Sequence, residues 1–175
     1  ALHCLPTRGH GAAAKKAGRT APDGLVGVLV RGNTGAVAEV NAETDFVAKN
    51  EQFQQFVREV TEIALDTGDN VDALLAATHP AGATVKDALT GHIATIGENM
   101  NIRRAAVLTV EPGVVVSYVH NAAKDGLGKI GVLIGLQSTA PADQLATLGK
   151  QLAMHVAAAI PLALDENGID PEVVE

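Results

Sequence analysis

The sequence predicts an α+β fold of two similar subdomains, each a small antiparallel sheet packed with helices. Two observations carry this prediction. Short β-branched apolar runs separated by Gly- or Pro-containing turns precede segments with helical periodicity. This order of strand, turn, strand, loop and amphipathic helix occurs once in each half of the 175-residue chain. Strands followed by helices are typical of an α+β architecture.

The elements of the first half follow from turn and cap residues. The turn Gly-Asn-Thr-Gly at 32–35 separates two strands and predicts a hairpin. Asn50 is a suitable N-cap for the long helix that follows. The predicted elements are an irregular N-terminal stump at 1–11, a helix at 12–17, strands at 25–30 and 36–40, a polar loop at 41–50 and a helix at 51–65.

The second half repeats the plan after two short helices. The last helix carries an apolar stripe, and we expect Leu152 in the core. The residues of this stripe are Leu145, Leu148, Leu152, Val156 and Ala157. The predicted elements are helices at 71–78 and 84–96, strands at 104–110, 114–120 and 129–137, a loop at 121–128 and a helix between Pro141 and Pro161. The predicted division is an N-terminal core subdomain at 12–67, a helical linker at 68–97 and a C-terminal core subdomain at 98–175.

Composition limits the class of protein. Hydrophobic residues make up 47% of the chain and aromatic residues 2%, so aliphatic side chains must form the core. The net charge of −7 argues against a nucleic-acid surface and is typical of a protein that contacts other proteins. No apolar run reaches the roughly 18 residues of a membrane span. The one cysteine, Cys4, allows no internal disulfide and indicates a reducing compartment, so we expect a cytoplasmic protein.

Signals for cofactor or metal chemistry are weak. The G-x-G-x-x-G pattern at 126–131 precedes a strand rather than a helix, so it predicts a glycine-rich loop and not a dinucleotide site. The histidines have no zinc spacing, and no calcium-loop pattern is present. We therefore predict no cofactor and no metal. An enzyme that uses His120 and Asp125 remains an alternative, although the residues alone favour a structural role for His120.

One aromatic residue lies outside the predicted core. Of the three phenylalanines, Phe53 and Phe56 lie on the apolar face of the first long helix, whereas Phe46 lies in the polar stretch before it. One interpretation is a hydrophobic staple, in which Phe46 or Val47 packs on the first helical turn. The other is an exposed aromatic wedge, offered to a partner beside the carboxylate of Asp45. The residues alone do not separate the two.

Three blocks identify a family resemblance. They are AKKAGR at 14–19, EVNAETDFVAKN at 39–50 and IGENMNIRR at 96–104. Shorter agreements follow as SYVH at 117–120, IGVL at 130–133 and AMHVAA at 153–158. In order and spacing these blocks resemble the elongation factor Ts family over residues 13–161. The family's small N-terminal helical domain and its T-G-A-G motif have no counterpart here, so we expect the core and dimerisation domain alone.

The resemblance implies a guanine-nucleotide exchange factor that acts by binding and not as an enzyme. Its partner would be elongation factor Tu, in the GDP-bound and nucleotide-free states, with the assembly open between a homodimer and a heterotetramer. The resemblance implies that Thr44, Asp45, Phe46 and Val47 enter the partner, where Asp45 disturbs the magnesium site. It also implies contacts at Lys16, Ile96, His120, Lys150 and Gln151. The alternative is a dimerisation or scaffold fragment without exchange activity.

Overall fold

A computed structural model describes residues 11–161 and 163 of the chain. The predicted irregular stump therefore lies outside the described residues, except for Gly11, which begins a helical turn over 11–16. The elements that follow are β1 (Asp23–Arg31), β2 (Thr34–Ala42), the 3-10 helix η1 (Val47–Lys49), α2 (Glu51–Thr67), α3 (Val71–Ala76), α4 (Val85–Ile96), β3 (Met100–Thr109), β4 (Gly113–His120), β5 (Leu127–Gly128), β6 (Ile130–Gln137) and α5 (Ala142–Ala159).

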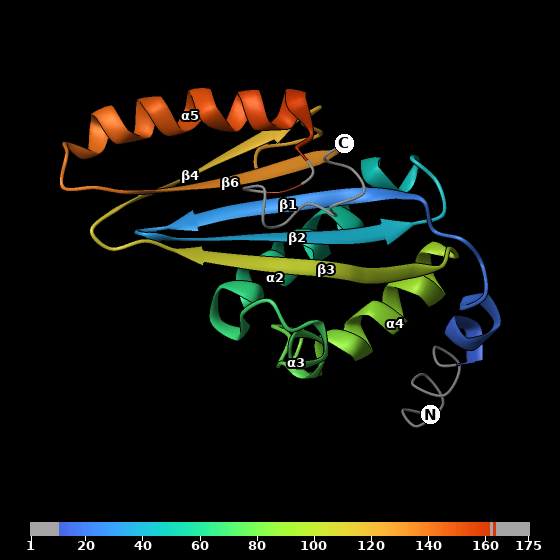
Figure 1. The fold of residues 1–175 in the computed structure, drawn as a ribbon. Helices are drawn as coiled ribbons and strands as arrows, with labels where there is room; N and C mark the ends of the chain where they lie inside the picture. The colour runs from blue at the N-terminus through green and yellow to red at the C-terminus, as the bar shows by residue number, and fades with distance from the viewer. Residues whose placement is uncertain (1–10, 162, 164–175) are drawn as a thin grey trace, which may run out of the picture.

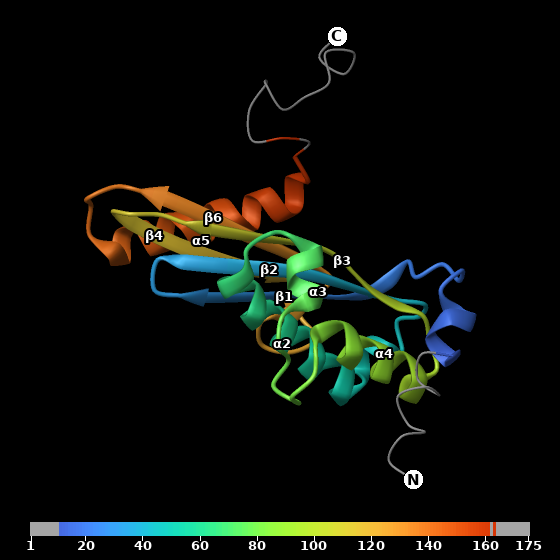
Figure 2. The ribbon, with the colours of Figure 1, turned by 90° about the horizontal axis from the view of Figure 1, so that it is seen from below.

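The elements form four layers (Figure 1). Strands β3-β2-β1-β5 form an antiparallel sheet, and β4 and β6 form a separate two-stranded ribbon. Helices α2, α3 and α4 lie on one side of the larger sheet, the ribbon lies on its other side, and α5 packs on the ribbon (Figures 1 and 2). This arrangement confirms the predicted α+β fold of small antiparallel sheets packed with helices.

The main core lies between the larger sheet and α2. Alternation along β2 turns Ala36, Ala38 and Val40 to this side, and all three are buried. The small alanine side chains allow α2 to approach closely and to bury both of its aromatic residues, Phe53 and Phe56. The helical period over 51–65 therefore predicted the buried face of α2 correctly.

Strand β3 pairs with β2 and not with β4. The ladder runs from Thr34 opposite Thr109 to Ala42 opposite Met100, with a register shift between Glu39 and Val40. This pairing buries Met100 and Ile102 of β3 in the same core as α2. The turn at 112–113 therefore leads from one sheet to the other instead of closing a hairpin. The division into subdomains at 12–67, 68–97 and 98–175 stays a prediction.

The glycine pattern at 126–131 serves packing. Gly126 has a φ of +70°, which favours glycine in the loop before β5. A Cβ on Gly131 would lie 2.7 Å from Val26 and 2.8 Å from Val28, so this glycine allows β6 to approach β1. The strand β5 was not predicted, because a two-residue strand carries no periodic pattern.

The predicted apolar stripe of α5 is correct at its two ends, Leu145 and Ala157, but wrong at its centre. Leu148 is 48% exposed and Leu152 is 38% exposed, so Leu152 is not in the core. The buried positions are Leu145, Gly149, Ala153 and Ala157. A Cβ on Gly149 would lie 2.7 Å from Val116, so small residues allow α5 to pack closely on the ribbon. At the centre of the helix the leucines gave the stronger periodic signal, but Gly149 and Ala153 are the buried residues.

We predict that Ala153→Leu lowers the free energy of unfolding by about 1–3 kcal/mol, because the added carbons cannot fit between α5 and the ribbon. The matched control Met154→Leu, at an exposed neighbouring position, should change it by less than about 0.5 kcal/mol. Urea unfolding monitored by circular dichroism measures both. Equal destabilisation of the two variants would contradict the observed helix phase.

Candidate functional site

The three sequence blocks of the family resemblance meet at one corner of the molecule. The Lys16 ammonium donates a hydrogen bond to the carbonyl of Ile93 near the end of α4 (3.3 Å). The side-chain amide of Asn99 donates to the carbonyl of Arg19 (2.6 Å). The Arg19 guanidinium also lies near Glu43, and β2 pairs with β3 from residue 100 onward, so residues 14–19, 39–50 and 96–104 contact one another although they are far apart along the chain.

Two carboxylates join the 39–50 block to the 96–104 block. Glu98 accepts hydrogen bonds from the Thr44 hydroxyl (2.6 Å) and the Thr44 backbone N–H (2.9 Å). Glu43 accepts from the Asn99 backbone N–H (2.6 Å) and lies 3.5 Å from the Arg19 guanidinium. We call this set of contacts the carboxylate clamp, made of Glu43, Thr44, Glu98 and Asn99. It holds the chain firmly just before Asp45.

The chain is held equally firmly after Phe46. Residues 47–49 form η1, whose turns are closed by hydrogen bonds from Lys49 N–H to the Phe46 carbonyl (3.1 Å) and from Asn50 N–H to the Val47 carbonyl (2.9 Å). The Asn50 side chain then caps α2 by accepting from Phe53 N–H (3.0 Å), as predicted. The buried Gln54 amide donates to the Ala48 carbonyl (2.7 Å).

Between these two anchors, Asp45 and Phe46 face solvent. Phe46 is 75% exposed, a value that leaves little of the ring in contact with the protein, whereas the neighbouring Val47 is buried in the main core. Val47 thus provides the local packing that the staple interpretation assigned to either residue. The exposure of Phe46 is the geometry expected of an aromatic side chain offered to a partner.

The other predicted contact residues lie on different elements. Lys16 and Ile96 are half-buried and lie at the corner described above. His120 is exposed at the end of β4, where its Nδ1 lies 3.3 Å from the Tyr118 hydroxyl. Lys150 and Gln151 are exposed on α5, which is separated from the larger sheet by the ribbon. The structure therefore places Lys16 against α4 and Ile96 at its end, two residues before Glu98, and leaves Lys150 and Gln151 on another layer (Figure 1).

The enzyme alternative at His120 and Asp125 lacks an assembled site. Asp125 is exposed, and its backbone carbonyl accepts a hydrogen bond from Arg58 (3.5 Å). No hydrogen bond or ion pair joins His120 to Asp125 among the contacts of the described residues. General acid–base catalysis needs such groups within hydrogen-bond reach of each other or of a shared proton.

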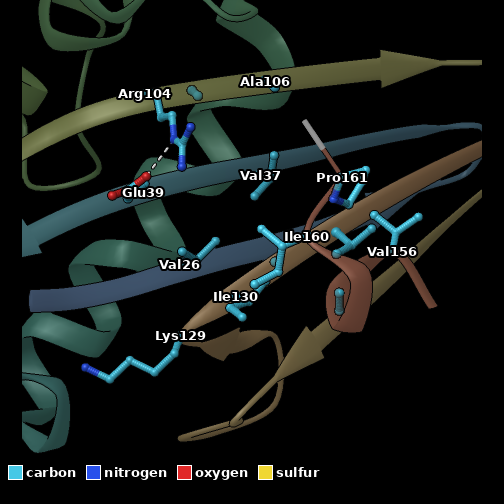
Figure 3. Close-up of a pocket in the computed structure, with 14 residues that line it drawn as sticks. Val26, Val37, Glu39, Arg104, Ala106, Lys129, Ile130, Val156, Ile160 and Pro161 are labelled. Carbon is cyan, nitrogen blue, oxygen red and sulfur yellow. Dashed lines mark hydrogen bonds and ion pairs between the residues drawn. The ribbon is translucent and has the colours of Figure 1, made fainter. Parts of the chain in front are cut away.

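A groove of about 640 Å³ lies between the larger sheet, β6 and the end of α5 (Figure 3). Its walls are mainly aliphatic, from residues such as Val26, Val37, Ile130 and Val156. The charged groups at its rim are paired within the chain: Arg104 Nε lies 2.6 Å from Glu39. Lys129 pairs with Asp23, and its hydrogen bond holds the pKa of that carboxyl below its ordinary value. Among the described residues that line this groove, each charged side chain therefore has a partner within the chain.

A second groove, of about 610 Å³ between α2 and α4, holds a histidine cluster that the sequence gave no reason to expect. His79 is buried, accepts the Ala81 N–H at Nδ1 (3.2 Å) and brings Nε2 to 2.9 Å from Glu59. The His92 ring packs on Phe56 at a centroid distance of 4.8 Å. Burial lowers the pKa of His92, nearby His79 lowers this pKa further, and Glu59 opposes both effects.

The cluster does not form a metal site. Within residues 11–161, no group of three or more His, Cys, Asp or Glu side chains is arranged to hold a metal ion. In the same part of the chain, no helix combines the length and the apolar character needed to cross a bilayer. The corner with Phe46 is the candidate functional site, because it presents an exposed aromatic ring and an exposed carboxylate between two anchored segments.

Comparison with known proteins points to one family. The family model described as Elongation factor TS matches residues 43–175. Elongation factor Ts of Zymomonas mobilis is 60% identical over 175 residues, and that of Rhizorhabdus wittichii is 59% identical. The matches cover all of this chain and 57% of each relative. Elongation factor Ts of Gluconobacter oxydans is 57% identical, with 58% of its length covered. The chain thus spans less than two thirds of the length of these relatives.

We predict that acidification destabilises the fold through His92. Its pKa in the folded state is below the ordinary value of about 6.5, so unfolding takes up a proton below that pH. The stability present above pH 6.5 is therefore lost as the pH falls toward the folded-state pKa. Urea unfolding between pH 5 and 8 should show a smaller loss in His92→Gln than in the parent chain. The exposed control His155→Gln should lose as much unfolding free energy between pH 8 and 5 as the parent does. An identical loss in all three proteins would rule out His92 as the source.

Proposed function

Because the chain belongs to the elongation factor Ts family, we propose that it is a guanine-nucleotide exchange factor that binds elongation factor Tu–GDP and promotes GDP release. The observation that supports this most directly is the 75% exposure of Phe46 between two rigid anchors. Its neighbour Asp45 is also exposed. An aromatic ring and a carboxylate are thus presented together, without the conformational cost of ordering a flexible loop on binding.

The proposed mechanism needs no bond-making step. The Phe46 ring inserts between elements of the partner near its nucleotide pocket, and Asp45 disturbs the partner's magnesium site. Tight binding to the nucleotide-free partner then weakens nucleotide binding by the same coupling free energy. A coupling of about 1–3 kcal/mol changes affinity roughly 5- to 150-fold. The protein acts as a binding factor and not as an enzyme.

Further contacts extend the proposed interface. Lys16 lies against α4, and Ile96 ends α4 two residues before the Glu98 that binds Thr44; both would contact the same part of the partner as the 43–50 segment. His120, Lys150 and Gln151 are exposed on β4 and α5 and would reach a second part of it. We propose that these contacts add affinity, while the exposed Asp45 and Phe46 act on the partner's nucleotide site and Thr44 and the buried Val47 hold them in place. The place of action would be the cytoplasm, where translation elongation occurs.

We predict that Phe46→Ala slows GDP release from elongation factor Tu at least about tenfold, because burial of an aromatic ring is worth about 1.5–3 kcal/mol. Its own free energy of unfolding should change by less than about 1 kcal/mol, since the ring is exposed. Release of a fluorescent GDP analogue from purified elongation factor Tu measures the first quantity and urea unfolding the second.

The matched control is Ile160→Ala, which removes another largely exposed apolar side chain at the end of α5. Its exchange rate should equal that of the parent chain. A parent chain that binds elongation factor Tu without accelerating release would favour the scaffold alternative. A Phe46→Ala variant with parental release would show that the ring is not the wedge.

We predict that Asp45→Asn weakens exchange in a magnesium-dependent manner. The amide keeps the size of the carboxylate but removes the charge that would act on the metal site. At millimolar Mg²⁺, the rate of GDP release with Asp45→Asn should be several-fold lower than with the parent chain. The two rates should become equal when a chelator removes the ion. The exposed control Asp66→Asn should behave as the parent does at every concentration. A gap independent of Mg²⁺ would contradict this role for Asp45.

A further inference from the structure

The carboxylate clamp continues the β2–β3 ladder with side-chain carboxylates as the hydrogen-bond acceptors. The last paired residues of the ladder are Ala42 and Met100. In an antiparallel register the next opposed residues are 43 with 99, and then 44 with 98. These are the residues of the clamp, but backbone carbonyls no longer serve as acceptors. The Glu43 carboxylate receives the Asn99 N–H, and the Glu98 carboxylate receives the Thr44 N–H.

This substitution of side chains for backbone carbonyls lets the strands separate without leaving N–H groups unpaired. Backbone N–H groups that are removed from water need an acceptor. A carboxylate on a side chain can supply one while its own backbone turns away from the sheet. Charge-assisted hydrogen bonds of this kind are stronger than neutral ones, and Glu98 makes two of them to one residue.

The clamp also has an independent anchor. Asn99 is buried, and its side chain donates to the Arg19 carbonyl, while the Arg19 guanidinium lies 3.5 Å from Glu43. The chain thus enters Asp45 and Phe46 from a fixed point, just as it leaves them through η1 and the Asn50 cap. Without the clamp, only the second anchor would remain.

We propose that Glu98 and Glu43 are positioning residues for nucleotide exchange, which hold Asp45 and Phe46 in the orientation that the partner binds. This inference rests on the proposed function. Neither carboxylate needs to touch the partner. Loss of the clamp reduces the fraction of molecules with a competent loop, and the apparent dissociation constant rises in inverse proportion to that fraction.

The kinetic signature separates positioning from direct contact. In Glu98→Ala, the concentration of factor that gives half-maximal GDP release should rise about tenfold, which corresponds to about 1.4 kcal/mol. The maximal rate should stay within about twofold of the parent, because the bound loop makes the same contacts once it is captured. Phe46→Ala, in contrast, should lower the maximal rate, since it removes the ring itself.

A second readout needs no partner. Hydrogen exchange of the Thr44 and Asn99 amides, which the clamp protects, should accelerate at least about tenfold in Glu98→Ala. The backbone N–H of Gln54 donates to the Asn50 carbonyl at the start of α2. It should exchange at the parental rate, which would show that the fold persists.

Conservative variants and a matched control complete the test. Glu98→Gln keeps an acceptor for the Thr44 N–H and should restore most of the loss, whereas Thr44→Val removes the hydroxyl and should reproduce a part of it. Glu62→Ala removes an exposed carboxylate that pairs with Arg31 at the other end of the β1–β2 hairpin, and it should match the parent in both assays.

The outcomes distinguish the two proposals. A parent chain that fails to accelerate GDP release overturns the proposed function and the positioning role with it. The positioning role alone is overturned if the parent is fully active and Glu98→Ala exchanges its Thr44 and Asn99 amides faster, yet needs the same concentration for half-maximal GDP release. A reduced maximal rate without loosened amides also overturns it, because Glu98 would then act by direct contact.

Discussion

The structure depends on the burial of both faces of the β1–β2 hairpin. One face of β2 packs on α2 through Ala36 and Ala38, and the opposite face of the hairpin packs on β6, where Gly131 allows close approach. Side chains with little or no volume are needed on both sides, because two layers must come within packing distance of the same strands. A hairpin held in this way cannot shift its register without exposing one set of apolar residues. The end of β2, where the candidate site begins, is consequently a fixed point.

Sequence patterns predicted most of this framework. The period of α2 predicted its buried face, and Asn50 predicted its start, because an N-cap and a run of large apolar residues are strong local signals. On α5 the same reasoning failed at the centre of the helix, since Gly149 and Ala153 carry little hydrophobic signal although they are the residues buried against the ribbon. The pairing of β3 with β2 depends on tertiary burial of Met100 and Ile102, which no local pattern encodes.

The candidate site was also predicted from the sequence only in part. Phe46 stood out as an aromatic residue in a polar stretch, but its exposure could not be derived from the sequence, because Val47 was an equally good candidate for the local packing. The contacts of Glu43 and Glu98 were also hidden, since they join residues more than fifty positions apart. Both segments carry the family resemblance, but a resemblance in sequence does not indicate that they touch. The histidine cluster at His79 and His92 gave no signal, because its members come from separate elements and have no recognisable spacing.

The two anchors around Phe46 leave only residues 45–49 between them, and η1 takes up the last three of these. A single inserted or deleted residue would turn every following position about the axis of the short helix, since each residue of a 3-10 helix advances by a third of a turn. The length of this segment is therefore set by the distance between the end of β2 and the start of α2, whereas its side chains can be exchanged one at a time. Evolution of partner specificity in this corner would then proceed by substitution, while insertions would be confined to loops elsewhere.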